Sequence, residues 1–163
     1  MAKNTSDVKV RRMTPDDLMR VNQIDRQLFG DQRVPTWPFS FETYWNMYGP
    51  GVNFVAEING VIVGFLAGTI VQQERSQSII DMMHESAART SRYPKIGYID
   101  MIGIATEYQN KNVGRALVNA FVEESKRLGA PVRAHIKESD ERLSKFLNKM
   151  GFKKWETATY EKE

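Results

Sequence analysis

The chain has no cysteine, only two histidines and no long hydrophobic run. The lack of cysteine excludes disulfides, thiolate metal sites and a cysteine nucleophile, and it fits a reducing compartment such as the cytoplasm, where we expect the protein. His84 and His135 are too few for a clustered zinc site, so we expect no metal. No stretch approaches the roughly 18 apolar residues that cross a bilayer, and residues Met1–Lys9 are polar. We therefore expect neither a membrane span nor a secretion signal.

The sequence does have the composition of one globular domain. Its 163 residues are 41% hydrophobic and 26% charged, which is close to globular averages. We therefore expect a single domain over residues 1–163, with 72–97 as a surface insertion. The net charge of +3 comes from 23 Lys and Arg against 20 Asp and Glu. A nucleic-acid-binding protein would need a basic stripe, and the sequence shows none, so we expect no nucleic-acid partner.

Strand-like and helix-like segments are mixed along the chain. Asn59-Gly60 joins two β-rich runs and supplies two positive-φ positions for a hairpin turn. Thr14-Pro15-Asp16-Asp17 has the features of a helix start. Val113–Leu128 has the strongest apolar stripe of helical period. In chain order we predict a strand over Val8–Arg12, a helix over Thr14–Gly30, a short helix from Phe41, strands over Asn53–Ile58 and Val61–Val71, a helix around Ile79–Arg89, a strand over Tyr98–Ile104, the helix Val113–Leu128, a strand over Val132–Ile136, a helix capped by Asp140 and a strand over Phe152–Tyr160.

An aromatic segment follows the first predicted helix. It contains Trp37, Phe39, Phe41, Tyr44, Trp45 and Tyr48. One interpretation is aromatic packing over the core, and the other is a wall of a substrate groove.

The most informative segment runs from Tyr98 to Leu117, where a strand enters a polar loop that opens onto the long helix. The first N–H groups of that helix lack intrahelical partners, which favours a bound phosphate. Lys111 and Arg115 add positive charge, Gly114 allows close approach to the backbone, and Asn112 tolerates a left-handed turn. The alternative interpretation is ordinary strand–loop–helix packing.

The loop Gln109-Asn110-Lys111-Asn112-Val113-Gly114 resembles the pyrophosphate loop of the GNAT superfamily of acyl-CoA-dependent N-acetyltransferases. That loop reads Gln or Arg, two residues, Gly, one residue, then Gly or Ala. The chain matches at Gln109 and Gly114 and departs at Asn112, where a left-handed Asn would preserve the loop. The order of elements and the closing Gly151-Phe152 are also similar to the family.

The resemblance implies an α/β (α+β) fold: a mixed, mostly antiparallel central sheet flanked by helices, with splayed fourth and fifth strands. It implies that acetyl-CoA is the cosubstrate and that its pantetheine arm lies between these strands. Asp140 stands where relatives place an asparagine that contacts this arm, although it also suits a helix cap. The residues that the resemblance assigns to the cofactor are the backbone of Ile102, Gly103 and Ile104, the loop residues Gln109, Asn110, Lys111, Asn112, Val113, Gly114 and Arg115, and Asp140.

The resemblance also implies direct attack of an amine on the acetyl thioester. Asp100 stands where relatives carry a base, and Tyr98 shares its strand face and can assist. The alternative for Asp100 is a carboxylate paired with a Lys or Arg. The family's tyrosine acid is replaced by Leu147, which leaves Tyr160, Tyr93 or solvent as the proton donor.

The acceptor implied by the resemblance is an amine-bearing small molecule or a protein or peptide. A protein N-terminus, a lysine side chain and a small amine or polyamine stay open. The alternative to an enzyme is a non-catalytic acyl-CoA-binding regulatory module with the same fold. Either a monomer or a homodimer fits the sequence.

Overall fold

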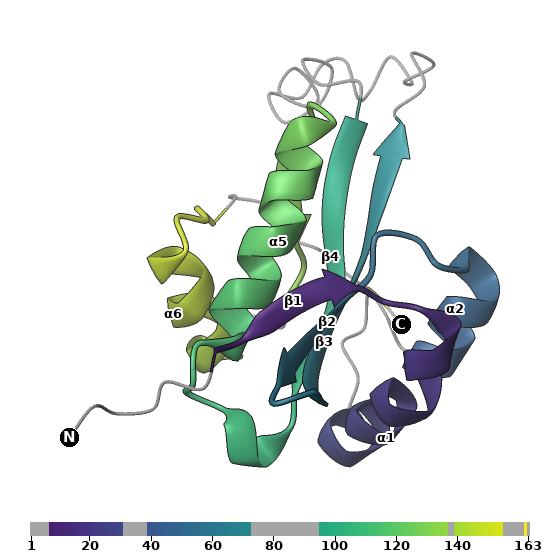
Figure 1. Cartoon of the computed structure of the whole chain (residues 1–163). Coiled ribbons are helices and arrows are strands. Elements are labelled where there is room, and N and C mark those ends of the chain that lie inside the picture. The colour runs from purple at the N-terminus through teal and green to yellow at the C-terminus, as the bar shows by residue number, and fades with distance from the viewer. Residues whose placement is uncertain (1–6, 31–38, 73–94, 137–138, 155–161, 163) are drawn as a thin grey trace, which may run out of the picture.

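A five-stranded sheet forms the centre of the described structure (Figure 1). The computed structural model describes residues 7–30, 39–72, 95–136, 139–154 and 162. The strand order is β1-β2-β3-β4-β5; the pairs β1–β2, β2–β3 and β3–β4 are antiparallel, and β4–β5 is parallel. The predicted mixed, mostly antiparallel sheet is thereby confirmed. The strands are β1 (Lys9–Arg12), β2 (Phe54–Ile58), β3 (Val61–Gln72), β4 (Lys95–Ile104) and β5 (Val132–Ala134).

Helices cover both faces of the sheet (Figure 1). On one face lie α1 (Leu18–Phe29), which follows the 3-10 turn η1 (Pro15–Asp17), and α2 (Phe41–Tyr48). On the other lie α5 (Val113–Arg127) and α6 (Glu141–Lys149). A second 3-10 turn, η2 (Thr106–Tyr108), leads from β4 toward α5. Consecutive residues of a strand point to opposite faces, so Phe65 packs with α1 and α2 while Leu66 packs with α5.

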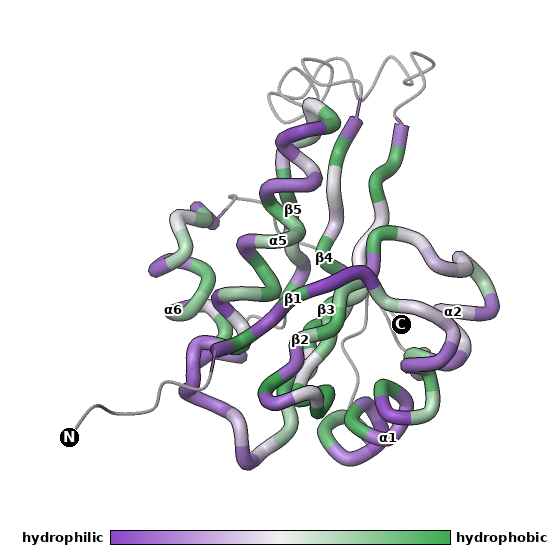
Figure 2. The backbone as a smooth tube through the Cα atoms, viewed as in Figure 1, coloured by the Kyte–Doolittle hydropathy of each residue, from purple (hydrophilic) through white to green (hydrophobic). Residues whose placement is uncertain are grey.

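Local sequence chemistry explains several of these elements. Asn59 and Gly60 have φ angles of 52° and 75°, the two positive values that a tight hairpin turn requires, and the predicted hairpin is confirmed. Gly30 ends α1 with a φ of 45°. Figure 2 shows hydrophobic and hydrophilic residues alternating along α5, whose buried face includes Val113, Leu117 and Phe121.

Some predicted boundaries differ from the structure. β4 begins at Lys95, so the stretch between β3 and β4 is shorter than the expected 72–97. β5 ends at Ala134, two residues before the predicted end. Phe152–Lys154, the start of the last predicted strand, has no strand structure. The remainder of that strand, the predicted helix at 79–89 and Trp37 lie outside the described residues.

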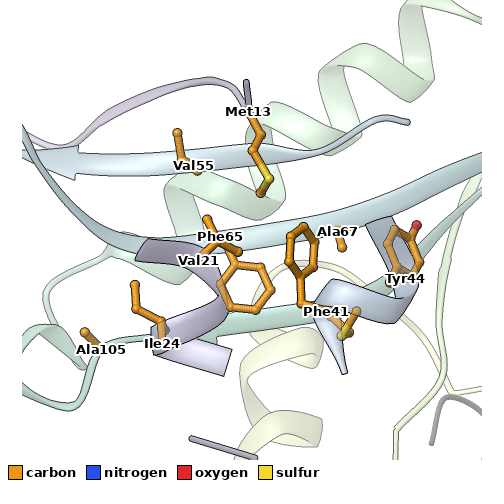
Figure 3. Close-up of a cluster of buried hydrophobic side chains, with 10 residues drawn as sticks. Met13, Val21, Ile24, Phe41, Tyr44, Val55, Phe65, Ala67 and Ala105 are labelled. Carbon is orange, nitrogen blue, oxygen red and sulfur yellow. The ribbon is translucent and has the colours of Figure 1, made fainter. Parts of the chain in front are cut away.

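Two apolar clusters hold the layers together. Figure 3 shows the one between the sheet and the α1/α2 pair, in which Phe41 and Phe65 contact at 5.2 Å between ring centroids. The Tyr44 ring lies at one end of this cluster, with its hydroxyl oxygen directed away from the other labelled side chains (Figure 3). Burial of such side chains stabilises the fold by about 25 cal/mol for each Å² of apolar surface. None of the helices in the described ranges has the length and apolar character needed to span a bilayer.

Candidate active site

One edge of β4 is open over its second half. β5 pairs with β4 at Gly97, Tyr98 and Ile99, and the strand then stops at Ala134. β3 continues alongside β4 as far as Ile104. Within the described residues, the segment Asp100–Ile104 therefore has a strand partner on one side only. Its unpaired backbone N–H and C=O groups can bind an extended ligand as a further strand would.

The polar loop after β4 is shaped by two left-handed asparagines. Asn110 and Asn112 both have a φ of 63°, a conformation that asparagine adopts more easily than most residues. Asn112 is the N-cap of α5, so the expected left-handed Asn is confirmed at this position. The Gln109 side chain donates to the Ile104 carbonyl oxygen at 3.3 Å and ties the loop to the end of β4. The loop thus keeps a turn at Asn112 without the glycine that the family pattern has there.

Positive charge gathers at this loop. Lys111 and Arg115 are exposed, and the Lys111 ammonium lies 5.3 Å from the centroid of the Tyr108 ring. Together with the free N–H groups at the start of α5, these cations favour a phosphate group.

Arg142 of α6 also reaches the loop, although no motif in the sequence indicated it. Its guanidinium donates to Gln109 Oε1 at 3.2 Å and to Asn110 Oδ1 at 3.3 Å. One feature of the sequence could have indicated Arg142, although weakly. Arg142 is a cation in the first turn of a helix, where the helix dipole favours anions, so its position is unusual. Arg142 therefore adds a third cation to the site and links α6 to the loop.

Gly114 lies at a point of close packing between α5, β4 and α6. Gly114 is buried, and a Cβ placed there would lie 3.0 Å from Ile104 Cδ1 and 3.4 Å from the Phe146 ring. The lack of a side chain lets α5 approach β4 and α6 closely. Val113 is also buried, so both residues can offer only their backbone to the loop.

Asp100 occupies a β-bulge in the middle of β4. Ala67 faces Met101 and Gly68 faces Ile99, so Asp100 has no partner on β3. A bulge redirects a side chain without ending the strand. The carboxylate Oδ2 accepts hydrogen bonds from the hydroxyls of Tyr44 at 2.9 Å and Thr69 at 3.1 Å.

Burial has the largest effect on the pKa of Asp100. It raises the pKa of Asp100 above the ordinary value, against the opposing effect of the two hydroxyl donors and of His135. In the described residues no Lys or Arg forms an ion pair with Asp100. A half-buried carboxylate of raised pKa beside an open strand edge is suited to accept a proton.

Tyr98 lies two residues before Asp100 on β4. Its cross-strand partner is Thr69, whose hydroxyl also contacts Asp100. The Tyr98 ring stacks on exposed His135 at 5.7 Å between centroids, and its hydroxyl oxygen accepts from Arg133 Nη1 at 3.5 Å. Tyr98 thus stands at the junction of β3, β4 and the residues after β5.

The remaining residues that the sequence predicted for the site lie at α6 or outside the part of the chain that the structure describes. Asp140 caps α6 by accepting the Leu143 N–H at 3.0 Å, which confirms the capping role. Leu147 is half-buried within α6. Tyr93 and Tyr160 lie outside the described residues. Across the ranges that the structure describes, no three His, Asp or Glu side chains gather in a way that could hold a metal ion.

Comparison with known proteins gives a family and a fold. The profile of the acetyltransferase (GNAT) family matches residues 21–152. No curated protein matches the chain in sequence.

Three solved structures illustrate the likeness in fold. The aminoglycoside N-acetyltransferase AAC(6')-Iy in complex with CoA has a TM-score of 0.71 at 14% identity, covering 100% of this chain and 98% of its own. A transcriptional regulator from Bacillus halodurans C-125 has a TM-score of 0.70 at 17% identity, covering 96% of this chain and 100% of its own. Naa50 from Arabidopsis thaliana, in complex with the bisubstrate analogue CoA-Ac-MVNAL, has a TM-score of 0.65 at 17% identity, covering 90% of this chain and 83% of its own.

Proposed function

Because the chain belongs to the acetyltransferase (GNAT) family, we propose that it transfers the acetyl group of acetyl-CoA to a primary amine. The observation that carries this proposal is the position of Asp100 at the start of the open β4 edge, with its pKa raised by burial. One strand thereby offers both a backbone edge for the cofactor and a base for the acceptor. The acceptor is a protein N-terminus, a lysine side chain or a small amine or polyamine.

The described residues fit acetyl-CoA. The open edge suits the pantetheine arm, which the backbone of Ile102, Gly103 and Ile104 would hold. The loop Gln109–Arg115, with its left-handed Asn110 and Asn112, suits the pyrophosphate. Asp140 Oδ1 is engaged in the cap of α6, and the other carboxylate oxygen would contact the arm. When bound, acetyl-CoA supplies an acetyl thioester with a good leaving group.

Asp100 is the proposed base. A primary amine is mostly protonated at neutral pH and cannot attack until it loses a proton. Asp100 accepts that proton, directly or through a water molecule, and its raised pKa makes it a stronger acceptor than an ordinary aspartate. The freed nitrogen lone pair then forms the new C–N bond as the C–S bond breaks, and the proton that this nitrogen loses on becoming an amide goes to the leaving CoA thiolate.

Tyr98 is the proposed assistant. Its hydroxyl oxygen accepts a hydrogen bond from Arg133, which leaves the hydroxyl proton available for donation. Leu147 has no proton to give. Tyr44 is fully buried, and burial raises its pKa well above the ordinary value, so it is poorly suited to act as the acid.

A non-catalytic acyl-CoA-binding module is the second candidate. The observation that favours it is Leu147, because a side chain without a proton stands where the family has its usual acid. This candidate predicts cofactor binding with no release of CoA for any amine.

Two measurements test the proposed function. A calorimetric titration with acetyl-CoA, with pantetheine as the control that lacks the pyrophosphate, should show binding of acetyl-CoA alone. CoA release is then followed with a panel of acceptors: an aminoglycoside, a peptide with a free N-terminus, a lysine-containing peptide and a polyamine. Binding without release for every acceptor would favour the module over the enzyme.

Asp100→Asn tests the base. The variant should slow transfer about a hundredfold or more while acetyl-CoA affinity stays close to that of the wild type. Glu107→Gln is the matched control, because it removes an exposed carboxylate from η2 near the same loop. Equal rates for Asp100→Asn and the wild type across the pH range would remove Asp100 from the mechanism.

A further inference from the structure

The Asp100 carboxylate is held at one oxygen only. Both hydroxyl donors, from Tyr44 and Thr69, bond to Oδ2. Within the described residues no hydrogen-bond donor reaches Oδ1. The carboxylate is therefore fixed by one oxygen, and the other is left for an external group.

The bulge explains how the two donors can meet one oxygen. Ile99 packs toward α5, whereas Met101 packs toward the α1/α2 pair. Asp100, as the extra residue, turns to the side of Met101 and meets Tyr44 of α2. Without the bulge, Asp100 and Met101 would point to opposite faces.

Tyr44 is itself firmly placed. Its side chain is fully buried, and its ring lies 6.1 Å from Phe41 and 5.0 Å from Tyr48 between centroids. The start of α2 is fixed by buried Asp25 of α1, whose carboxylate accepts the Phe41 N–H at 3.1 Å. The hydroxyl of Tyr44 thus reaches Asp100 from a helix anchored at its N-terminus.

We propose that Tyr44 and Thr69 are positioning residues that hold Asp100 by Oδ2 and leave Oδ1 to take the proton from the acceptor amine. This inference rests on the proposed acetyl transfer. Neither Tyr44 nor Thr69 belongs to the loop motif, and the order of elements indicates no catalytic role for either residue. Neither touches the reacting atoms, because both act through Asp100.

Several other groups bear on the charge of Asp100. The electrostatic effect of His135 lowers the pKa of Asp100. Tyr98 lies between Thr69 and His135 and accepts from Arg133. The two hydroxyl donors also favour the carboxylate, so their removal raises the pKa of Asp100 further. A higher pKa moves the formation of the carboxylate to higher pH.

Conservative variants test the proposal. Tyr44→Phe and Thr69→Val each remove one hydroxyl and keep the shape of the side chain, whereas Thr69→Ser keeps the hydroxyl as the matched control. The titration of the Asp100 carboxyl is followed by carbon-13 NMR in the free protein, with thermal unfolding as a check of the fold. The pH profile of kcat is measured in parallel.

We expect both deletions to move the Asp100 titration and the acidic limb of the kcat profile to higher pH, and Thr69→Ser to restore both. At neutral pH kcat should fall about tenfold for each deletion, with the KM for acetyl-CoA unchanged. An unchanged Asp100 titration in both deletion variants would overturn the proposal. A shifted titration with an unmoved kcat profile would also overturn it.

The NMR titration keeps the two proposals separate. It needs neither cofactor nor acceptor, so it reports on Tyr44 and Thr69 even if no amine is acetylated. A wild type that releases no CoA with any acceptor refutes the proposed acetyl transfer, and with it the role of Oδ1 in the reaction. The titration alone decides whether the hydroxyls hold the carboxylate.

Discussion

Arg142 on α6 and Gln109 in the loop before α5 are joined by a hydrogen bond of 3.2 Å. The Gln109 side chain in turn donates to the carbonyl oxygen of Ile104 at the end of β4. One amide side chain therefore connects a helix, a loop and a strand that are separate in sequence. This connection ties the loop proposed to hold the pyrophosphate to both α6 and β4.

We expect Arg142→Ala to weaken acetyl-CoA binding about fivefold to tenfold, since it removes two hydrogen bonds that order the loop and one positive charge beside it. Isothermal titration calorimetry measures the change. Lys145→Ala removes an equal charge from an exposed position of the same helix and serves as the control. A similar loss in both variants would mean that only the overall charge of α6 matters.

The left-handed conformation of Asn112 predicts which substitutions this position tolerates. Asn112→Gly should keep the affinity for acetyl-CoA, because glycine adopts a φ of 63° without strain. Asn112→Ala should lose affinity and destabilise the loop by about 1 kcal/mol, the cost of a left-handed Cβ. Calorimetry and thermal unfolding of the two variants give the comparison. Equal behaviour of Gly and Ala at this position would show that backbone conformation does not limit the loop.

Gly114→Ala should destabilise the fold by about 1–3 kcal/mol, because the new methyl group would meet Ile104 and Phe146. Denaturant unfolding measures the loss. The double variant Ile104→Val/Gly114→Ala removes the methyl carbon that lies 3.0 Å from the added Cβ, so it should recover part of that loss. If the two changes are simply additive, the close contact is not the cause.

Substitutions at Gly114 perturb packing and binding together, so Arg115→Ala is the better probe of the loop. Arg115 is exposed on α5, and its truncation should leave stability nearly unchanged. Acetyl-CoA affinity should fall, and the fall should be smaller at high salt because the contact is electrostatic. A loss of affinity that does not depend on salt would argue against a phosphate contact.

An ion pair between exposed Arg11 and buried Asp17 predicts a pH dependence of stability. Asp17 accepts two hydrogen bonds from the Arg11 guanidinium, at 2.7 Å and 2.9 Å, which hold the pKa of Asp17 below its usual value. A lowered pKa in the folded state means stabilisation that is complete above the unfolded value of about 3.9. That stabilisation is lost as the pH falls through the lower folded value.

Asp17→Asn should therefore lower the free energy of unfolding by about 1–2 kcal/mol at pH 7. The loss is smaller than for a fully buried ion pair because Arg11 is partly exposed to solvent. The difference from the wild type should shrink below pH 4. Urea unfolding at a series of pH values follows it, with exposed Asp16→Asn as the control. A difference that persists unchanged at low pH would show that the ion pair is not its source.

Much of the fold could be predicted from the sequence because it depends on local rules. The hairpin follows from Asn59-Gly60, the tight turn that needs two positive φ angles. The apolar period of Val113–Arg127 fixes both the existence of α5 and the face it buries. Asp100 and the loop at Gln109 could be located as well, because they belong to one continuous segment.

The tertiary structure alone decided what surrounds that segment. Tyr44 and Asp100 are 56 positions apart, and a bulge in β4 brings them together; no periodicity in sequence indicates a bulge of this kind. Arg142 reaches the loop from a separate helix, and Gly114 lies where α5 packs closely against Ile104 and Phe146. The sequence determined which chemical groups the site can contain, because turns, caps and amphipathic periods act over a few neighbouring residues. Which oxygen of Asp100 is held, and by which hydroxyls, depended on how the layers pack, since contacts between distant residues are set only when the sheet and helices come together.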